Sequence, residues 1–400
     1  MNLNITNACS KPYLYSLNNQ QKANTPKAVS FRGQELVTPE VTKKLQLIDN
    51  EVKKANKIAI VTHIKPDGDA AGSAAAVKNL ILSKYPDKEV DVFIAGSLSN
   101  RFQCIKNSES FEYINKNSNI EAIKSRNYDL SISVDSAETK LIDKSCLEVF
   151  NSAPTKIKID HHPAKDDYAD INLTCPNASS AAQVVLLLAE HMGVKPNKEL
   201  ASDLYLGIVT DTAGFRYMQK PADVFEDCSK LAKTGFDTRE IYCSSMDSMS
   251  KEALRFYADT LKNIKFTEDN KIAYIVDDSI TEQDPSTRRK KGINTSKTFD
   301  KTGLDSDTVK DIMSKTVGII MPNIEGVKIA AKITEEDNRM KDCFETGASL
   351  RGKGVNVSDF ATENGGGGHT FAAAFKESKK TAAKIIEDLS AYLSSKEQAN

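Results

Sequence analysis

Short apolar segments alternate with longer helical segments through the first half of this 400-residue chain. Residues 57–62, Lys-Ile-Ala-Ile-Val-Thr, form a β-branched run of the kind found in buried parallel strands. A turn-rich segment and an alanine-rich helical stretch at 69–84 follow it. Such alternation predicts an α/β domain in which helices cover a parallel sheet through right-handed crossovers. The further strand candidates are 90–95, 130–134 and 156–159, and the further helix candidates are 179–192 and 200–210.

A connecting helix is predicted at 245–262, and the pattern changes after it. Strand-like segments lie at 272–276, 317–321 and 327–333, and a final helix falls within 372–393. We therefore expect a smaller mixed α/β domain in the C-terminal part of the chain. The predicted divisions are a disordered tail over 1–40, a first domain over 41–244, the linker helix over 245–262 and a second domain over 263–395.

Composition and charge exclude several classes of protein. Hydrophobic residues make up 40% of the chain and charged residues 27%, as in ordinary globular proteins. The net charge is −1, so no broad basic surface for long duplex DNA is expected. The longest apolar run, 184–189, is far shorter than the roughly 20 residues of a membrane span. Seven scattered cysteines without a CxxC pair indicate reduced thiols, and we expect a cytoplasmic protein that does not enter membranes.

Potential metal ligands gather where the first predicted strand ends. His63, Asp67 and Asp69 lie within seven residues, and Pro66 and Gly68 between them favour a turn that could wrap around a cation. The alternative is a turn in which the aspartates cap the backbone or the following helix. Ligands bind at the carboxyl edge of open α/β sheets, so this position is suited to a binding site. The local sequence alone favours neither metal binding nor capping.

Three further acidic or histidine-containing positions follow predicted elements in the same way. Asp135 comes just after the strand at 130–134, and Asp211 ends an apolar helix, where the helix dipole disfavours a carboxylate. Asp160, His161 and His162 follow the strand at 156–159. In an extended backbone adjacent histidines point to opposite sides, so one can bind metal while the other faces a substrate.

These positions should converge on one edge of one sheet. Carboxylate and imidazole donors without thiolates suit Mn²⁺ or a similar divalent ion, and several clustered carboxylates need more than one cation to offset their repulsion. Two ions about 3.5–4 Å apart are suited to in-line attack of activated water on phosphorus. The predicted metal ligands are His63, Asp67, Asp69, Asp135, His161 and Asp211.

A glycine run in the C-terminal part indicates phosphate binding. Four glycines, 365–368, precede His369, and glycine amides at the start of a helix can bind an anion. Ser349 and Arg351 offer a hydroxyl and a cationic fork for a second phosphate. A polar insertion at 284–303 carries the basic run 288–291, which is either a solvated loop or a contact to a phosphate backbone.

Taken in order, these motifs resemble those of the DHH phosphoesterases. The segment from His63 to Ser73, then Asp135, the Asp160-His161-His162 triplet and Asp211, are similar to the successive motifs of the family's first domain. Gly366–His369 resembles the GGGH motif of the DHH-associated C-terminal domain. The resemblance extends from about residue 45 to 390 and is greatest to the short bacterial oligoribonucleases, or nanoRNases, which also dephosphorylate 3′-phosphoadenosine 5′-phosphate (pAp).

The resemblance implies a role for each motif residue. His63, Asp67 and Asp135 would hold one metal, and Asp69, Asp135, His161 and Asp211 the other, with Asp135 bridging. His162 would contact the scissile phosphate and Asp160 would orient it, so that these two and Asp135 are the expected catalytic residues. The expected substrate ligands, across a cleft between the domains, are Ser349, Arg351, Gly366, Gly367, Gly368 and His369.

The resulting expectation is a Mn²⁺-dependent hydrolase, with Mg²⁺ or Co²⁺ as alternative ions, that cleaves short RNA to mononucleotides, pAp to AMP, or both. The alternatives are a cyclic or linear dinucleotide (pApA) phosphodiesterase and a manganese pyrophosphatase; a nucleotide-binding module without activity is a further one. The expected partner is short RNA or a nucleotide. A homodimer is left open.

Overall fold

A computed structural model of the chain describes residues 36–163, 166–278, 304, 306–338 and 343–398. The chain divides into two compact units, Met1–Ser248 and Met249–Asn400. Most of the predicted tail and the whole basic insertion at 284–303 lie outside the described residues. Among the described helices, none combines the length and the apolar composition that crossing a membrane requires.

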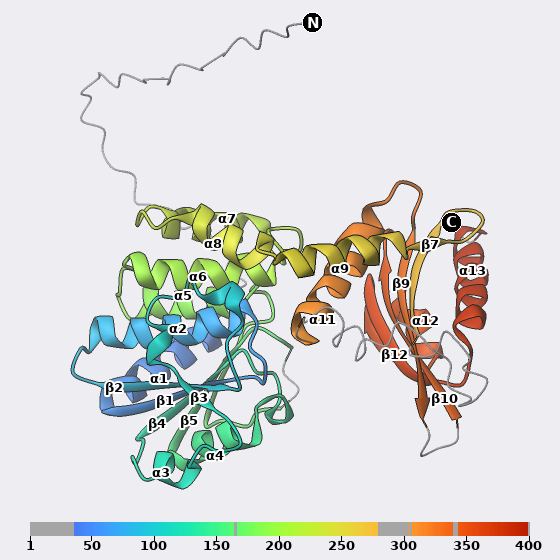
Figure 1. The fold of residues 1–400 in the computed structure, drawn as a ribbon. Coiled ribbons are helices and arrows are strands. Elements are labelled where there is room, and N and C mark those ends of the chain that lie inside the picture. Colours follow the sequence, from blue (N-terminus) through green and yellow to red (C-terminus); the bar gives the residue numbers. More distant parts are fainter. Residues whose placement is uncertain (1–35, 164–165, 279–303, 305, 339–342, 399–400) are drawn as a thin grey trace, which may run out of the picture. The chain divides into compact units, whose positions relative to one another are not determined.

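The first unit contains a sheet of six parallel strands in the order β3-β2-β1-β4-β5-β6 (Figure 1). The chain runs outward from β1 to β3 on one side of the sheet, and from β4 to β6 on the other. The order therefore reverses between β1 and β4, and ligands of doubly wound sheets bind at such a reversal, beyond the carboxyl ends of the strands. The strands are β1 (Lys57–Thr62), β2 (Glu89–Ala95), β3 (Glu112–Ile114), β4 (Leu130–Val134), β5 (Thr155–Asp160) and β6 (Ile171–Thr174).

Helices cover both faces of this sheet because successive strand residues point to opposite sides. In β1, Ile58 and Ile60 pack in one buried cluster with helices α1 (Pro39–Lys54), α2 (Gly68–Lys84) and α5 (Ala181–His191). Ala59 and Val61 pack in a second cluster under α4 (Lys144–Ser152), beside α3 (Ile120–Lys124). The sheet is thus buried on both sides, and only its edges are available for a site.

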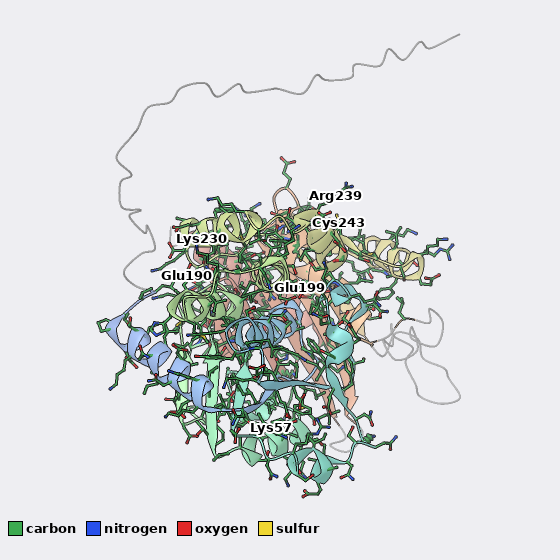
Figure 2. All side chains as sticks on the ribbon, turned by 90° about the vertical axis from the view of Figure 1, so that its left-hand side faces the viewer. Lys57, Glu190, Glu199, Lys230, Arg239 and Cys243 are labelled. Carbon is green, nitrogen blue, oxygen red and sulfur yellow. The ribbon has the colours of Figure 1, made fainter. Side chains whose placement is uncertain are left out.

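A second layer of helices lies over α2 and α5. Helix α6 (Lys198–Asp211) packs on both of them, and α7 (Pro221–Ala232) packs on α6, next to α8 (Thr238–Tyr242). Lys230 of α7 and Glu190 of α5, both labelled in Figure 2, pair at 3.5 Å. Because α6 is anchored on both α2 and α5, its C-terminal Asp211 has a fixed place near the start of α2.

The second unit is built on a mixed sheet in the order β11-β12-β10-β9-β8-β7 (Figure 1). Strands β8 and β9 are parallel and the other neighbours are antiparallel. Helices α12 and α13 cover one face, whereas α11 and the short helical turns η5 and η6 lie on the other over β8 and β9, and η5 also contacts β10. The strands are β7 (Lys265–Phe266), β8 (Ile272–Asp278), β9 (Ile329–Asn338), β10 (Cys343–Gly352), β11 (Gly367–His369) and β12 (Ala372–Ser378). The helical elements are α9 (Lys251–Lys262), α11 (Ser306–Lys315), η5 (Thr316–Ile320), η6 (Met321–Asn323), α12 (Ser358–Glu363) and α13 (Ala382–Gln398).

The α/β fold class is confirmed, and the strands β1, β2, β4 and β5 lie within one residue of their predicted bounds. The predicted strand at 317–321 is wrong, because this segment is helical. Met313, Val317 and Met321 are buried in one cluster, and their spacing of four residues is helical rather than strand-like.

Two predicted helices also differ from the structure. The alanine-rich start of the final helix is strand β12, in which Ala373 and Phe375 are buried at a spacing of two, and α13 begins only at Ala382. The connecting helix is interrupted: a π-helical turn ends at Asp247, and Ser250 caps the start of α9 by accepting a hydrogen bond from the amide of Ala253. Strands β3, β6, β7, β10 and β11 were not predicted.

Candidate metal centre

Three neighbouring strands of the first sheet end in potential metal ligands. His63 follows β1, Asp135 follows β4, and Asp160 is the last residue of β5, directly before His161. The N-terminus of α2 adds Asp67 and Asp69, and the last residue of α6 is Asp211. The six predicted metal ligands therefore converge at the point where the strand order reverses.

The first group consists of His63, Asp67 and Asp135, whose donor atoms lie within 4.8 Å of one another. His63 Nε2 is 3.8 Å from Asp67 Oδ1 and 3.8 Å from Asp135 Oδ2. Its Nδ1 donates to the carbonyl oxygen of Ile64 at 2.9 Å, and this bond fixes the tautomer that leaves Nε2 as a lone-pair donor.

Asp67 also caps the N-terminus of α2, the role that the sequence offered as the alternative to metal binding. Its Oδ1 accepts hydrogen bonds from the amides of Asp69 and Ala70, both at 3.0 Å. The cap holds the carboxylate in place beside His63, so capping and metal binding are compatible at this residue.

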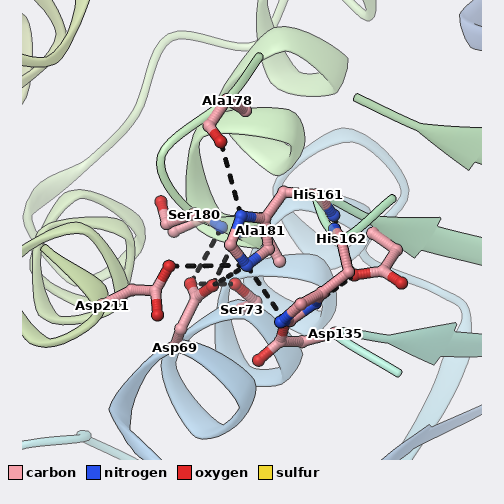
Figure 3. Close-up of polar contacts among 12 residues, drawn as sticks. Asp69, Ser73, Asp135, His161, His162, Ala178, Ser180, Ala181 and Asp211 are labelled. Carbon is pink, nitrogen blue, oxygen red and sulfur yellow. Dashed lines mark hydrogen bonds and ion pairs between the residues drawn. The ribbon is translucent and has the colours of Figure 1, made fainter. Parts of the chain in front are cut away.

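The second group consists of Asp69, His161 and Asp211, again with donor atoms within 4.8 Å. Figure 3 shows the His161 ring among three carboxylates. Its Nε2 lies 3.4 Å from Asp211 Oδ2, 3.7 Å from Asp135 Oδ1 and 3.9 Å from Asp69 Oδ2. Its Nδ1 donates to the carbonyl oxygen of Ala178 at 3.4 Å, so Nε2 is again the lone-pair donor.

Asp135 lies between the two groups, and its two oxygens are divided between them. Oδ2 faces His63 of the first group and Oδ1 faces His161 of the second. The backbone of Asp135 is left-handed, with φ 55°, a conformation that aspartate tolerates better than most residues. This turn at the end of β4 directs the carboxylate to the midpoint of the cluster.

Asp69 is fixed by the N-terminus of α5. Its Oδ2 accepts from the amide of Ala181 at 2.6 Å, and its Oδ1 accepts from the amide of Ala182 at 3.0 Å and from Ser73 Oγ at 3.1 Å (Figure 3). Gly207 of α6 makes room for this arrangement, because a Cβ atom there would lie 2.6 Å from Asp69 Oδ1. Sequence reasoning missed Gly207, and only its place in the turn before Asp211 could have indicated it.

The electrostatics of the cluster call for cations. Burial and the neighbouring carboxylates raise the pKa of Asp135 well above its usual range, and the same causes raise the pKa of Asp211 to about 9. Asp135 Oδ1 and His161 Nε2 are buried without a hydrogen-bond partner among the described residues. Divalent cations would satisfy both atoms and neutralise the carboxylates, so these residues fit a metal centre.

Asp160 and His162 form a hydrogen-bonded pair next to the second group. His162 Nδ1 also lies 3.5 Å from Asp135 Oδ1, and Asp135, His161 and His162 form a third group of potential ligands within 4.8 Å. Asp160 Oδ1 accepts from the amides of His161 and His162 at 2.8 and 3.1 Å, and from His162 Nδ1 at 2.9 Å. This contact raises the pKa of His162, whose side chain is 49% exposed, whereas Asp160 is fully buried. The pair therefore consists of a half-exposed imidazole held through Nδ1 by a buried carboxylate.

The turn that carries Asp135 has a support that the motifs did not indicate. Tyr168 bonds Ser133 Oγ and the carbonyl oxygen of Ser136, both at 2.8 Å. The fully buried Lys158 donates to the carbonyl oxygens of Ala137 and Asp166. A lysine inside a predicted strand was the available signal, because a buried cation needs nearby oxygen acceptors.

The predicted phosphate ligands lie in the second unit. Ser349 and Arg351 belong to β10, and His369 ends β11. The expectation that the glycine run starts a helix is wrong, since the run leads into the β11–β12 hairpin. Gly366 and Gly368 let β11 approach β12, because a Cβ atom on either residue would lie within 2.6 Å of the β12 backbone. A Cβ atom on Gly367 would have no atom within 4 Å.

Comparison with known proteins agrees with this geometry. Residues 57–208 match the model of the DHH family, N-terminal domain. The Bacillus subtilis protein named bifunctional oligoribonuclease and PAP phosphatase NrnA is 25% identical, over 83% of this chain and 93% of its own length. A Mycoplasma pneumoniae protein named only as uncharacterized is 26% identical, over 88% of this chain and 96% of its own length.

Among solved structures, an exopolyphosphatase-related protein from Bacteroides fragilis has the same fold. Its TM-score is 0.70 at 24% identity, and the match covers 88% of this chain and 96% of that one. The matched segment 57–208 contains every residue of the two donor groups except Asp211, which lies three residues beyond it. Residues 57–208 are thus similar to the N-terminal domain of the DHH family, the family that the motifs of the sequence resemble.

Proposed function

We propose that this protein is a Mn²⁺-dependent phosphoesterase that hydrolyses short oligoribonucleotides to mononucleotides and pAp to AMP. The observation that carries the proposal is the division of the Asp135 carboxylate between two donor groups. A carboxylate in this position suits a pair of divalent ions, and paired ions are typical of hydrolysis at phosphorus.

His63, Asp67 and Asp135 would hold one ion, and Asp69, Asp135, His161 and Asp211 the other. Oxygen and imidazole donors without sulfur favour Mn²⁺, with Mg²⁺ or Co²⁺ as alternatives. When bound, such ions supply Lewis acidity toward the phosphoryl group and the attacking water. The hydrogen bonds at Nδ1 of both histidines support this assignment, because they select the neutral tautomer in which Nε2 carries the lone pair toward the carboxylates.

His162 and Asp160 would act on the substrate rather than on the metals. Asp160 holds the imidazole through Nδ1 and stabilises its protonated form. The outward Nε2–H can then donate to a phosphoryl oxygen as negative charge develops there. We assign His162 as the catalytic group that contacts phosphate and Asp160 as the residue that positions it.

The second unit would bind the substrate through Ser349, Arg351, His369 and the glycines Gly366, Gly367 and Gly368. A guanidinium fork and an exposed imidazole are suited to phosphate. The net charge of −1 argues against a surface that binds many phosphates at once, so a short substrate is favoured. The relatives named oligoribonuclease and PAP phosphatase support the same substrate class.

A direct test measures hydrolysis by the purified protein with Mn²⁺ on five substrates: pAp, pApA, a short RNA, a long RNA and pyrophosphate. We expect turnover of pAp and the short RNA, and much slower turnover of the long RNA. EDTA should abolish all of it.

Each alternative predicts a different result in the same assay. Exclusive turnover of pApA would indicate a dinucleotide phosphodiesterase, and exclusive turnover of pyrophosphate would indicate a pyrophosphatase. Binding of these compounds without any turnover would indicate a nucleotide-binding module. Any of these three results would contradict the proposal.

A further inference from the structure

A buried polar layer lies beneath the two segments that bring Asp135 and His161 to the metal centre. In β4 and β5 the apolar residues, such as Ile132 and Ile159, pack in the cluster with α1, α2 and α5. Because successive strand residues point to opposite faces, the residues that alternate with them lie on the face that carries α4. Four of these are polar or charged and fully buried: Ser131, Ser133, Lys158 and Asp160. A fully buried lysine is unusual, because other groups must bind its desolvated charge.

Lys158 connects the two segments that carry the ligands. Its Nζ donates to the carbonyl oxygen of Ala137 at 3.3 Å, two residues beyond Asp135. It also donates to the carbonyl oxygen of Asp166 at 2.8 Å, four residues beyond His162. Both acceptors lie outside the helices and strands. The ammonium group therefore fixes the turn after β4 against the segment after β5.

Tyr168 adds a second connection between the same segments. Its hydroxyl donates to the carbonyl oxygen of Ser136, the residue directly after Asp135, at 2.8 Å. The same hydroxyl accepts from Ser133 Oγ, also at 2.8 Å. The Tyr168 ring lies 5.3 Å from Lys158 Nζ, within the range of a cation–π interaction. Lys158 and Tyr168 thus hold the turn through two successive carbonyl oxygens.

These connections act on one side of the Asp135 carboxylate. Oδ1 lies 3.7 Å from His161 Nε2 and 3.5 Å from His162 Nδ1, and both histidines directly follow β5 (Figure 3). Oδ2 faces His63, which follows β1 and is held separately by backbone pairing with Ile142. The two connections run to the segment after β5, so they control how closely Oδ1 approaches the second donor group.

We propose that Lys158 and Tyr168 are positioning residues that hold Asp135 Oδ1 at the second donor group, so that the ion bound there depends on both of them. Lys158 is fully buried and acts on the site only through the turn that carries Asp135. The inference rests on the proposed function for its two metal ions. It adds an unequal outcome: loss of either connection weakens the ion held with His161 and leaves the ion held with His63.

Two substitutions break the connections, and a third is their control. Lys158→Met removes the ammonium group and keeps a side chain of similar length, and Tyr168→Phe removes only the hydroxyl. Tyr128→Phe is the matched control, because Tyr128 packs in the same cluster as Tyr168 and its hydroxyl donates to Asp91 Oδ2 at 2.6 Å. Tyr128 precedes β4 and thus lies at the end of the strand opposite to Asp135. Circular dichroism and chemical unfolding report the fold and the stability of each variant.

Mn²⁺ binding to the full-length protein is measured by equilibrium dialysis, and the coupling of the two ions by electron paramagnetic resonance. We expect the Kd of one ion to rise by about 10- to 100-fold in Lys158→Met, as for loss of other groups that orient metal ligands. Tyr168→Phe should raise the same Kd several-fold. The other ion should bind as in the unmodified protein, and the coupled signal should be lost at Mn²⁺ concentrations that saturate the unmodified protein.

Steady-state kinetics on pAp give a second readout. Excess Mn²⁺ should restore kcat in both variants, and KM for pAp should not change, because neither residue is a ligand of the substrate. Tyr128→Phe should lose stability but keep both ions and their coupling. In protein that carries His161→Ala and binds a single ion, adding Lys158→Met should not weaken that ion.

Unchanged affinity for both ions in Lys158→Met and Tyr168→Phe would overturn the proposal, as would equal weakening of both ions or the same loss in Tyr128→Phe. If Lys158→Met does not fold, Tyr168→Phe, which loses one hydroxyl, decides the question. When the proposal fails in one of these ways, two bound ions and pAp hydrolysis in the unmodified protein would leave the proposed function intact. Fewer than two ions in the unmodified protein would contradict both.

Discussion

The two candidate binding regions of this protein are built in opposite ways. At the edge of the first sheet, donors from three strand ends and two helix ends meet around the buried carboxylates of Asp69 and Asp135, and backbone hydrogen bonds fix several of them. On the second sheet, the candidate ligands lie on one face, where Ser349 and His369 are exposed and Arg351 is half-buried, and Gly367, Ala372 and Ala374 lie between them. The first region is acidic and the second carries cationic and neutral donors.

This difference separates the expected roles of the two regions. A buried carboxylate cluster is unstable without cations, so it is suited to holding metals for the chemical step. An exposed face with a guanidinium, an imidazole and a hydroxyl is suited to holding an anionic substrate. Substitutions in the first region should therefore act on kcat, and substitutions in the second should act on KM.

The largest effect is expected at Asp135. Asp135→Asn keeps the left-handed backbone, which asparagine also tolerates, and removes the charge shared by the two donor groups. We expect kcat for pAp to fall by at least about 10³-fold, since several kcal/mol of transition-state stabilisation depend on the metals. Steady-state kinetics at saturating Mn²⁺ measure this.

Asp203→Asn is the matched control for that substitution. Asp203 is also buried in the first unit, and burial raises its pKa well above the usual range, but its partner is Asn79 of α2 and it belongs to neither donor group. We expect normal kcat for Asp203→Asn. A loss as large as that of Asp135→Asn would mean that any buried carboxylate in this unit matters equally, and would remove the special role of Asp135.

An intermediate effect is expected at Arg351. Removing a guanidinium that binds phosphate costs about 1.5–3 kcal/mol, which corresponds to a rise in KM of about 10- to 100-fold for Arg351→Ala. Mn²⁺ binding and kcat should change little. Lys265→Ala, on β7 at the far edge of the same sheet, is the control and should leave KM unchanged. A changed Mn²⁺ stoichiometry in Arg351→Ala would contradict the assignment of metal binding to the first region and substrate binding to the second.

The smallest effects are expected in the glycine run, where neighbouring positions should behave differently. A Cβ on Gly366 would lie 2.1 Å from the carbonyl oxygen of Ala374, so Gly366→Ala should lower stability by about 1–3 kcal/mol. A Cβ on Gly367 would have no atom within 4 Å, so Gly367→Ala should keep the stability. The added methyl group would lie where the substrate is expected to bind, and KM should rise several-fold. Thermal unfolding and kinetics of the two variants distinguish these effects. An unchanged KM in Gly367→Ala would argue against substrate binding at Gly367.

The same contrast explains how well each region could be predicted from the sequence. In the first unit, β-branched runs such as 57–62 are largely apolar, and His63, Asp135 and Asp160 directly follow such runs, so local pattern indicated both the strands and the candidate ligands. The donor groups themselves depend on strand order, which local pattern does not contain. The motif order, through its resemblance to a family, supplied that missing information.

In the second unit, local pattern was misleading. Ala372, Ala373 and Ala374 favour a helix by propensity, but pairing with β10 and β11 makes them a strand. Val317 and Met321 were interpreted as part of a strand, although they lie on one face of a helical segment.

The most direct test of the central claim is the number of Mn²⁺ ions bound by each chain. Equilibrium dialysis with elemental analysis, together with electron paramagnetic resonance, measures both the number of ions and their coupling. We expect the unmodified protein to bind two Mn²⁺ ions per chain that are magnetically coupled through a shared ligand. Asp135→Asn should bind at most one ion, and Arg351→Ala should bind two ions. A single ion in the unmodified protein, or two coupled ions retained in Asp135→Asn, would contradict this expectation.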